Sequence, residues 1–275
     1  MIGIIRIAIA TLVGATGLLV WAALAGGTQP YDTYESTVAG DGPVAQYRFD
    51  DAYGSSTLAD SAGSYAATNS EATLGGEGPF GGSKSGLLAS EAFATLPSSP
   101  LAEASAFTVE AWVYWDGGSS YKQPIFDFGS DESDYMYLTP ASGLSEHQML
   151  FEIRAGSTSF QVTAPTLTDK AWEYVAVSES GSGTLTLYLN GEQVGQTTGA
   201  TISPSSLGST PDDYLGKSLI ASDPFFDGRM SNVAFYATEL SSGQLKAHYD
   251  AAELPVNTTA PTISGTPTEG NSLSA

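Results

Sequence analysis

Residues 171–194 read AWEYVAVSESGSGTLTLYLNGEQV, and this stretch decides the fold class. The segment TLTLYL at 184–189 alternates polar and apolar residues, a period of two that is typical of a half-buried β-strand. Asn190-Gly191 follows, the dipeptide best suited to the φ > 0 positions of a tight hairpin turn. Residues 192–198 return as the partner strand, and 172–178 supply another strand just before. The stretch therefore predicts a β-meander inside an all-β domain.

Other segments show the same alternation. AQYRF at 45–49 and MLFEI at 149–153 each place apolar residues on one face, as do Val233 and Phe235. FTVEAWVYW at 107–115 is apolar on both faces, which predicts a strand in the middle of a layered structure. Together these segments predict about ten to fourteen short strands in two packed antiparallel sheets.

One helix is predicted near the end of the domain. Ser241 is a suitable N-cap, and Gln244 three residues later completes a capping box. The helix is expected over about 242–250, on the surface of the sandwich, with Leu245 and Tyr249 docked onto it and His248 also on this surface helix.

Four ordered segments carry a resemblance to a known family. They are W-x-Y-V-A-V…L-x-L-Y-L-N-G-x-x-V at 172–194, VAQYRFDDAYGSSTLADSAG at 44–63, FTVEAWVYWDGG at 107–118 and FFDGRMSNVAFYATELSSGQLKAHYD at 225–250. Taken in chain order, the four segments resemble a laminin-G-like, concanavalin A-like lectin-glucanase domain of the bacterial surface-protein type. The resemblance covers roughly 41–252 and implies a two-sheet antiparallel jelly-roll sandwich with one short C-terminal helix. It does not identify a ligand, because one sandwich hosts many functions.

The amino-acid composition limits how the fold is stabilised and which classes of partner the protein can bind. The 275 residues include 41% hydrophobic residues, enough to bury a core, and no cysteine, so disulfides cannot hold the fold. Nine basic residues against 30 acidic ones give a formal net charge of −21. Nucleic acid is excluded as a partner because a duplex requires a basic face.

The N-terminus reads as an export segment. Arg6 precedes an apolar run over 7–25, and Ala23-Leu24-Ala25 matches a signal-peptide cleavage site. The run is almost long enough to span a bilayer, so an uncleaved membrane anchor over 1–25 is the alternative. Either interpretation predicts a secreted or cell-surface protein.

The remaining boundaries follow from composition. Residues 26–42 are polar and predicted to be a linker, and 43–252 form the jelly-roll domain. Residues 253–275 are rich in Pro and Thr, as in an extended spacer. Their last part resembles the opening strand of an immunoglobulin-like repeat, which implies further domains C-terminal to residue 275.

No catalytic constellation is visible in the sequence. Glycosidases with this fold place carboxylates two residues apart on one strand, as E-x-D-x-E. Glu110 and Glu152 each stand alone, and His147 and His248 are far apart without recognisable partners. We therefore expect a non-catalytic protein.

The resemblance also implies a structural Ca²⁺ ion where the first and last strands meet. The matching residues are Asp50 or Asp51, Asp60 and Asp227, and Asn232 could add a carbonyl oxygen. Ser231 and Asn232 stand where the family usually has two acidic residues, which removes charge from the expected site. The alternative is that these aspartates only start turns.

Loops on a rigid scaffold are the expected place for a ligand. The candidate ligand-binding residues in or beside predicted loops are Tyr121, Asp131, Asp134, Tyr214, Asp223 and Phe225. The alternative is that the aromatic ones close the ends of the sandwich.

The resemblance implies a carbohydrate- or glycoprotein-binding adhesion module of a longer exported bacterial surface protein. A targeting module of a polysaccharide-degrading enzyme and a passive spacer domain are the alternatives.

Overall fold

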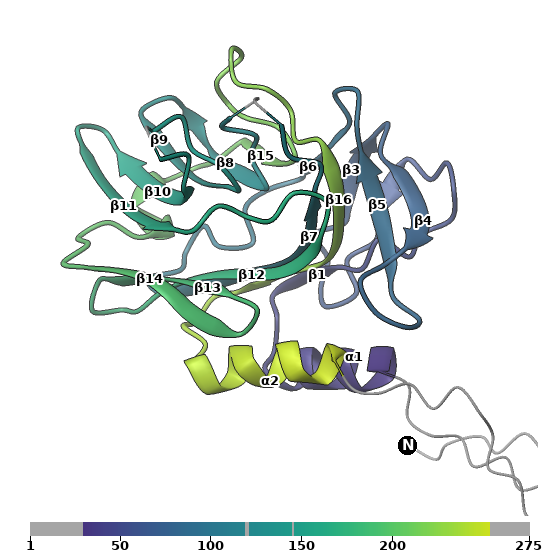
Figure 1. Cartoon of the computed structure of the whole chain (residues 1–275). Coiled ribbons are helices and arrows are strands. Elements are labelled where there is room, and N and C mark those ends of the chain that lie inside the picture. Colours follow the sequence, from purple (N-terminus) through teal and green to yellow (C-terminus); the bar gives the residue numbers. More distant parts are fainter. Residues whose placement is uncertain (1–29, 119–120, 145, 254–275) are drawn as a thin grey trace, which may run out of the picture. The chain divides into compact units, whose positions relative to one another are not determined.

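Two antiparallel β-sheets pack face to face (Figure 1). The computed structural model describes residues 30–118, 121–144 and 146–253, and these contain sixteen strands, eight in each sheet. Sheet A runs in the order β14 (Glu192–Thr198), β13 (Thr184–Leu189), β12 (Trp172–Glu179), β7 (Phe107–Trp115), β16 (Gly228–Tyr236), β5 (Lys84–Leu88) and β4 (Thr73–Glu77), with β1 (Ala45–Tyr47) paired to β16. Sheet B runs in the order β11 (Thr158–Ala164), β10 (Met149–Ala155), β9 (Asp134–Thr139), β8 (Phe126–Asp131), β15 (Asp212–Leu215), β6 (Phe93–Leu96), β3 (Ala67–Ser70) and β2 (Thr57–Leu58). The predicted all-β sandwich is confirmed.

The predicted meander is present as β12, β13 and β14 in sequence order. The turn residues Asn190 and Gly191 have φ values of 52° and 79°, as the tight hairpin requires. Strand β7 lies between β12 and β16, and eight of its nine residues are buried. The doubly apolar segment 107–115 is thus a central strand, as predicted.

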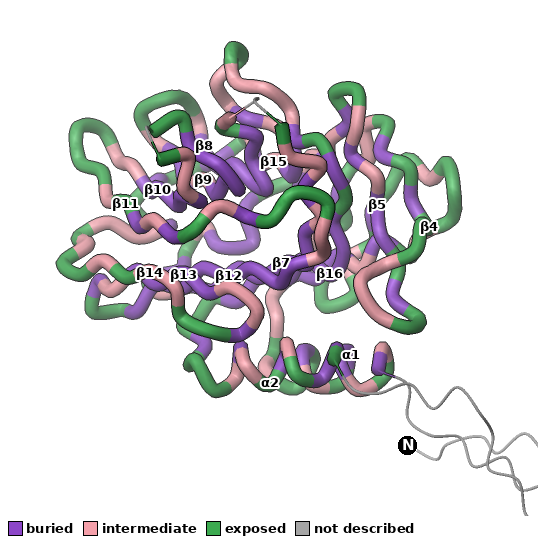
Figure 2. The backbone as a smooth tube through the Cα atoms, in the orientation of Figure 1, coloured by how far each residue is buried: buried purple, intermediate pink, exposed green. Residues whose placement is uncertain are grey.

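The main core fills the space between the sheets. Residues that alternate inward from both sheets form it, such as Phe107 and Val175 from sheet A and Phe126 and Phe151 from sheet B. Figure 2 shows the strands as largely buried and the connecting loops as exposed. This core uses the inner face of each sheet, so the outer faces are available for other contacts within or outside the domain.

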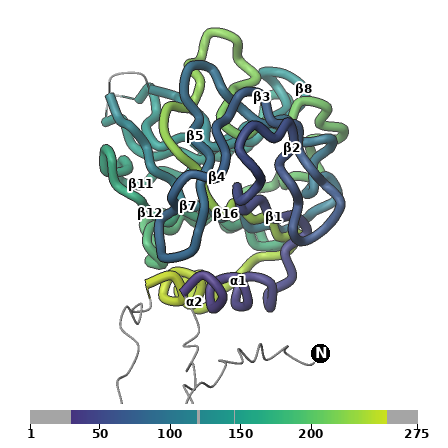
Figure 3. Tube along the Cα trace, turned by 90° about the vertical axis from the view of Figure 1, so that its right-hand side faces the viewer, coloured from purple at the N-terminus to yellow at the C-terminus, as the bar shows by residue number. Residues whose placement is uncertain are grey.

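Two helices cover the outer face of sheet A. Helices α1 (Pro30–Gly40) and α2 (Ser242–Ala252) lie side by side beneath it (Figures 1 and 3). A second apolar cluster fills the interface, with Tyr34 and Leu245 from the helices and Trp112 from β7 fully or almost fully buried. The ring of Trp112 stacks on that of Tyr249, with centroids 5.8 Å apart. The outer face of sheet A is therefore part of the folded core.

Helix α2 begins as predicted. The Ser241 hydroxyl accepts a hydrogen bond from the Gln244 N–H at 3.3 Å, and the Gln244 side chain accepts one from the Ser241 N–H at 3.0 Å. This reciprocal pair is the capping box, and Leu245 is fully buried beneath it.

Helix α1 corrects the prediction of a linker over 26–42. Over the described part of that range, Pro30–Gly40 forms a helix that packs on the sandwich. Tyr34 and Val38, one turn apart, are completely buried, and the Tyr34 ring lies 4.9 Å from that of Phe80. Pro30 at the first helical position, where no N–H is needed, was the local sequence signal for its start.

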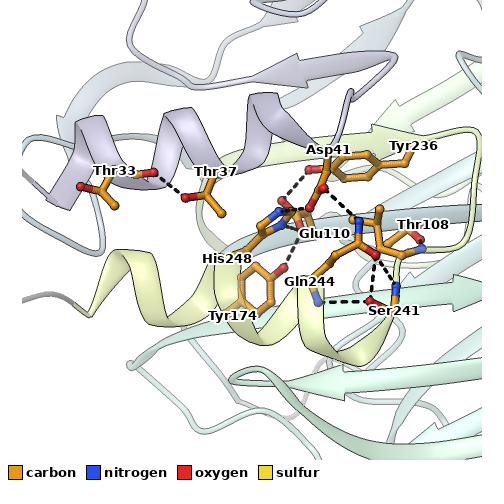
Figure 4. Close-up of polar contacts among 11 residues, drawn as sticks. Thr33, Thr37, Asp41, Thr108, Glu110, Tyr174, Tyr236, Ser241, Gln244 and His248 are labelled. Atoms are coloured by element: carbon orange, nitrogen blue, oxygen red, sulfur yellow. Dashed lines mark hydrogen bonds and ion pairs between the residues drawn. The ribbon is translucent and has the colours of Figure 1, made fainter.

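A buried polar network ties both helices to sheet A (Figure 4). The carboxylate of Glu110, at the centre of β7, accepts hydrogen bonds from the Tyr174 hydroxyl at 2.5 Å and the Tyr236 hydroxyl at 3.1 Å. The His248 ring lies between two carboxylates, with Nδ1 2.8 Å from Glu110 and Nε2 2.9 Å from Asp41. His248 lies on the predicted surface helix, but its side chain faces sheet A and is completely buried.

This network places one basic side chain between two acidic ones. Burial alone would lower the pKa of His248, but the carboxylates of Glu110 and Asp41 outweigh that effect and raise it above its usual value. Burial, together with the charge of Glu110, raises the pKa of Tyr174 and Tyr236, so both phenols remain hydrogen-bond donors. An imidazolium between two carboxylates therefore joins α1, α2 and β7.

Two carboxyl groups in the main core lack such a partner. Asp213 on β15 and Glu179 on β12 are almost completely buried, and each has one carboxyl oxygen without a hydrogen bond. Burial raises the pKa of each of them to about 8. Both side chains are consequently protonated in the folded protein at neutral pH.

The free energy of unfolding is expected to fall as the pH rises. In the unfolded chain these carboxyls titrate near about 4, so between pH about 4 and 8 the folded state holds protons that the unfolded state releases. Asp213→Asn should flatten this fall and raise stability at pH 8 by roughly 1–3 kcal/mol. Urea unfolding at pH 5 and pH 8 measures both effects, with the exposed Asp32→Asn as control. An identical pH slope in wild type and Asp213→Asn would contradict the assignment.

Neither of the two described helices combines the length and apolar character needed to cross a bilayer. The predicted export segment at 1–25 and all but the first residue of the predicted spacer at 253–275 lie outside the described residues.

Candidate functional site

One row of side chains crosses the whole outer face of sheet B. On β8, β9 and β10 the inward residues are core aromatics and aliphatics, so the residues between them point outward. The strand registers place these outward residues opposite one another from strand to strand. In spatial order the row is Thr57, Thr68, Thr95, Tyr214, Asp127, Tyr137, Glu152 and Gln161. Every member of the row carries a hydrogen-bonding group. No helix covers this face among the described residues, whereas α1 and α2 cover the outer face of sheet A.

Half of this row, from Asp127 to Gln161 at the β11 end, lies in a pocket of about 220 Å³. Three connections rise around it: the loop after β15, the residues before β8, and the turn after β9. The lining residues are Lys122, Asp127, Tyr135, Tyr137, Ser142, Gly143, Leu144, Leu150, Glu152, Gln161, Ser218, Leu219, Ile220 and Asp223. We refer to it as the sheet B pocket. A pocket of this kind, with aromatic rings and a few convergent polar groups, is the usual form of a small-molecule site.

Asp127 lies at the floor of the sheet B pocket. One of its carboxyl oxygens, Oδ2, accepts hydrogen bonds from the Ser218 hydroxyl and the Leu219 N–H, both at 3.0 Å. The other, Oδ1, is buried and has no partner. Burial raises the pKa of Asp127 to about 7, against the effect of the two hydrogen bonds. Asp127 therefore holds the loop after β15 against the sheet and keeps one acceptor unused.

Asp223 and Lys122 face each other at the rim. The Lys122 Nζ atom lies 3.7 Å from the Asp223 carboxylate, and the lysine side chain is about half exposed. Burial raises the pKa of Asp223, and the ammonium of Lys122 partly offsets the rise. The ammonium of Lys122 is screened by solvent and can rearrange around a ligand, whereas the Asp223 side chain is largely buried.

Two tyrosines provide the aromatic surface. The rings of Tyr135 and Tyr137 meet edge to face with centroids 5.8 Å apart. Burial, followed by the charge of Glu152, raises the pKa of Tyr135 to about 12 and raises that of Tyr137 further. Both phenols stay protonated and can donate as well as accept hydrogen bonds.

An aromatic group adjoins the pocket along the row. The ring of Phe93 lies 5.8 Å from that of Tyr214 and 5.9 Å from that of Phe225. The Lys217 Nζ atom lies over Tyr214 at 4.3 Å and over Phe93 at 4.6 Å. These half-buried rings extend the binding surface beyond Asp127.

Three of the predicted ligand residues lie on this surface. Asp223 lines the sheet B pocket, and Tyr214 and Phe225 belong to the adjoining aromatic group. Asp223 and Phe225 also line a second, more open pocket of about 380 Å³.

The other three predicted ligand residues lie elsewhere. The ring of Tyr121 stacks on that of His147 with centroids 3.6 Å apart. Asp131 and Asp134 flank the β8–β9 turn, where they accept hydrogen bonds from the backbone N–H groups of Ser133 and Gly156. None of the three lines either of the two pockets described.

The residues that sequence reasoning missed are Asp127, Tyr137, Glu152 and Gln161. Their local signal was present: Asp127 stands between Phe126 and Phe128, which predicts an outward polar residue on a strand. That signal identifies only the face of one strand on which Asp127 lies. The pairing of the strands determines which residues of β9 and β10 lie beside it.

The predicted calcium residues are not assembled into one group. Among the described residues, no three or more His, Cys, Asp or Glu side chains form a group that could hold a metal ion. The carboxylate of Asp60 accepts three backbone hydrogen bonds, from Gln46, Ala62 and Tyr65, at 2.8–3.0 Å.

The other three calcium candidates are dispersed. Asp50 accepts a hydrogen bond from the Tyr31 hydroxyl at 3.4 Å, and Asp227 is exposed beside the second pocket. Asn232 is buried in β16, with one side-chain oxygen unpartnered. Calcium binding at these residues stays a prediction.

Comparison with known proteins agrees with this architecture. The sequence profile of the concanavalin A-like lectin/glucanases superfamily matches residues 88–246, more than half of the chain. No curated protein sequence matches the chain.

Solved structures with the same fold are distant in sequence. Domain 4 of AbnA, a GH43 extracellular arabinanase from Geobacillus stearothermophilus, in complex with arabinotriose, has a TM-score of 0.60 and 20% identity, covering 76% of this chain and 98% of that one. The botulinum neurotoxin serotype C1 binding domain has a TM-score of 0.58 and 12% identity, covering 77% and 52%. The Trypanosoma rangeli sialidase in complex with sialic acid has a TM-score of 0.56 and 14% identity, covering 76% and 32%. This chain thus spans about half of the neurotoxin domain and a third of the sialidase. On the profile match, the chain belongs to the concanavalin A-like lectin/glucanases superfamily.

Proposed function

We propose that this protein is a non-catalytic carbohydrate-binding module that holds a saccharide across the outer face of sheet B. The observation that carries the proposal is the polar row of sheet B, which runs through a pocket lined by Tyr135 and Tyr137. Sugars present hydroxyl groups beside apolar C–H faces, and a site with aromatic rings and hydrogen-bonding side chains complements both. The solved complexes of the structural relatives with arabinotriose and sialic acid support a saccharide ligand.

The absence of catalysis is part of this proposal. Asp127 and Glu152 both line the pocket, but they stand on β8 and β10 with β9 between them, so they do not form the E-x-D-x-E arrangement of one strand. Asp127 is 3% exposed and already anchors Ser218 and Leu219.

A glycan array tests the proposal. The full chain is expected to bind a defined subset of glycans, and prolonged incubation with these glycans should release no new reducing ends. No binding to any glycan would favour the passive spacer alternative. Release of reducing ends would overturn the non-catalytic assignment.

A second part of the proposal concerns the cellular context of the protein. We propose an exported module of a longer bacterial surface protein that contributes to adhesion, with further domains beyond residue 275. The arabinanase domain among the relatives favours the alternative of a targeting module attached to a polysaccharide-degrading enzyme. The full open reading frame separates the two, since immunoglobulin-like repeats indicate adhesion and a glycosidase domain indicates targeting.

Calcium is tested by thermal unfolding of the full chain in EDTA and in millimolar Ca²⁺. The predicted structural site requires a higher unfolding midpoint with Ca²⁺, because binding to the native state stabilises it by mass action. The increase should disappear in Asp60→Asn. An unchanged midpoint in wild type would contradict the prediction.

A further inference from the structure

The sheet B pocket holds an excess of negative charge. Asp127, Glu152 and Asp223 line about 220 Å³, and Lys122 is the only cation among the lining residues. Lys122 is half exposed and lies 3.7 Å from Asp223. Arg154, the nearby cation on β10, does not line the pocket, and its Nε–H donates to the Gly156 carbonyl. Two carboxylates thus have no cationic partner among the side chains that line the pocket.

One of these carboxylates has an acceptor that is not used. Asp127 is only 3% exposed, and among the described residues no donor forms a hydrogen bond with its Oδ1 atom. A buried acceptor left without a donor costs about 1–3 kcal/mol, and more when it is charged. A donor that enters the pocket and reaches its floor would remove this cost.

The neighbouring acidic side chains make a positively charged donor more favourable than a neutral one in this pocket. The charge of Asp223 opposes ionisation of Asp127, and burial opposes ionisation of both. Among the described residues the three carboxylates do not form a group that could hold a metal ion. The pocket is therefore complementary to a ligand group that brings positive charge and several N–H donors together.

We infer that the sheet B pocket selects a saccharide that carries an ammonium group, an amino sugar, and rejects sugars that carry a carboxylate. This inference rests on the proposed saccharide-binding function and names its ligand class. An ammonium group has three donors and no acceptor, so it complements the unpaired acceptor of Asp127 and the other carboxylates that line the pocket. Charge-assisted hydrogen bonds of this kind are roughly twice as strong as neutral ones. A uronic or sialic acid would add a further negative charge to a pocket that already has three carboxyl groups.

Calorimetric titration of the full chain with three trisaccharides tests the inference. The probes are the trimers of glucosamine, N-acetylglucosamine and galacturonic acid. The glucosamine trimer is expected to bind about ten-fold or more tightly than its N-acetyl form, equivalent to about 1.4 kcal/mol. This preference should weaken as salt is added. The galacturonate trimer should show no binding.

Two variants locate the effect. Asp127→Asn keeps an oxygen acceptor for Ser218 and Leu219 but removes the charge, so the preference for glucosamine should fall towards one. Asp32→Asn removes the same charge from helix α1, outside the pocket, and should leave the preference intact. Unchanged thermal unfolding of Asp127→Asn verifies that the loop remains anchored. If that variant loses stability, Glu152→Gln provides the same test without touching the loop anchor.

The outcomes separate the inference from the proposed function. Equal binding of the amine and N-acetyl trimers, or stronger binding of galacturonate, overturns the inference while saccharide binding stands. Binding of neutral glycans on the array with none of the three probes bound also overturns it. Failure of every glycan to bind overturns the proposed function itself.

Discussion

Tyr137→Ala is expected to weaken saccharide binding by about 30-fold or more. Within the sheet B row, Tyr137 stands between Asp127 on one neighbouring strand and Glu152 on the other. It also lines the pocket and is only half buried, so its ring is available to a ligand. Loss of a central aromatic side chain from a binding site typically costs about 2 kcal/mol or more, which corresponds to this factor. Calorimetric titration with the strongest glycan from the array measures it.

Two further variants define what the ring contributes. Tyr137→Phe keeps the aromatic face and should lose only the share of affinity carried by the hydroxyl, within about ten-fold. Tyr53→Ala is the matched control, because Tyr53 is 84% exposed and lines neither of the two pockets described. Full affinity in Tyr137→Ala would place the saccharide elsewhere. Equal losses in Tyr137→Ala and Tyr53→Ala would point to a general effect on the protein.

His248→Ala is expected to lower the free energy of unfolding by about 3–5 kcal/mol. Among the described residues, His248 is the one cation in contact with the Glu110 carboxylate, and the substitution removes it while that carboxylate stays fully buried. Breaking a buried ion pair from one side has this order of cost, because an uncompensated charge remains. It also removes the link to Asp41, which joins α1 to α2. Urea unfolding of the full chain near pH 6 measures the change.

The pH dependence of this effect has a definite sign. The pKa of His248 is raised in the folded state, so its contribution is complete below about pH 6.5, the unfolded value, and is lost as the pH rises through the folded pKa. The difference between wild type and His248→Ala should therefore shrink at alkaline pH. His147→Ala, at the other histidine of the chain, lacks the charged partners and should cost far less. Saccharide affinity should be unchanged in His248→Ala, since the network lies on the outer face of sheet A. A stability loss below about 1 kcal/mol would contradict this account of the network.

The fold could be read from the sequence because its signals are local. The alternation at 184–189 and the turn at Asn190-Gly191 each act within one hairpin, and the structure confirms both. The capping box of α2 spans four residues and is equally local. Helix α1 has no such complete pattern: its burial depends chiefly on Tyr34 and Val38, and the sheet face that receives them is assembled from β7, β12 and β16.

The site could not be read in the same way because it depends on strand pairing. Asp127 and Glu152 each occupy an ordinary outward position, and only the order β8, β9, β10 makes them neighbours of Tyr137. The contact of Glu110 with His248 joins residues 138 positions apart. Reasoning from loops found Asp223, Tyr214 and Phe225, which lie beside the row, and missed the strand residues that form it.

The most direct measurement is an NMR titration of the isotopically labelled full chain with the strongest glycan from the array. The account predicts chemical-shift changes in the backbone amides of β8, β9 and β10 and of residues 218–223, with little change in α1 and α2. Changes centred on the helices or on the β8–β9 turn, with the sheet B row unaffected, would contradict it.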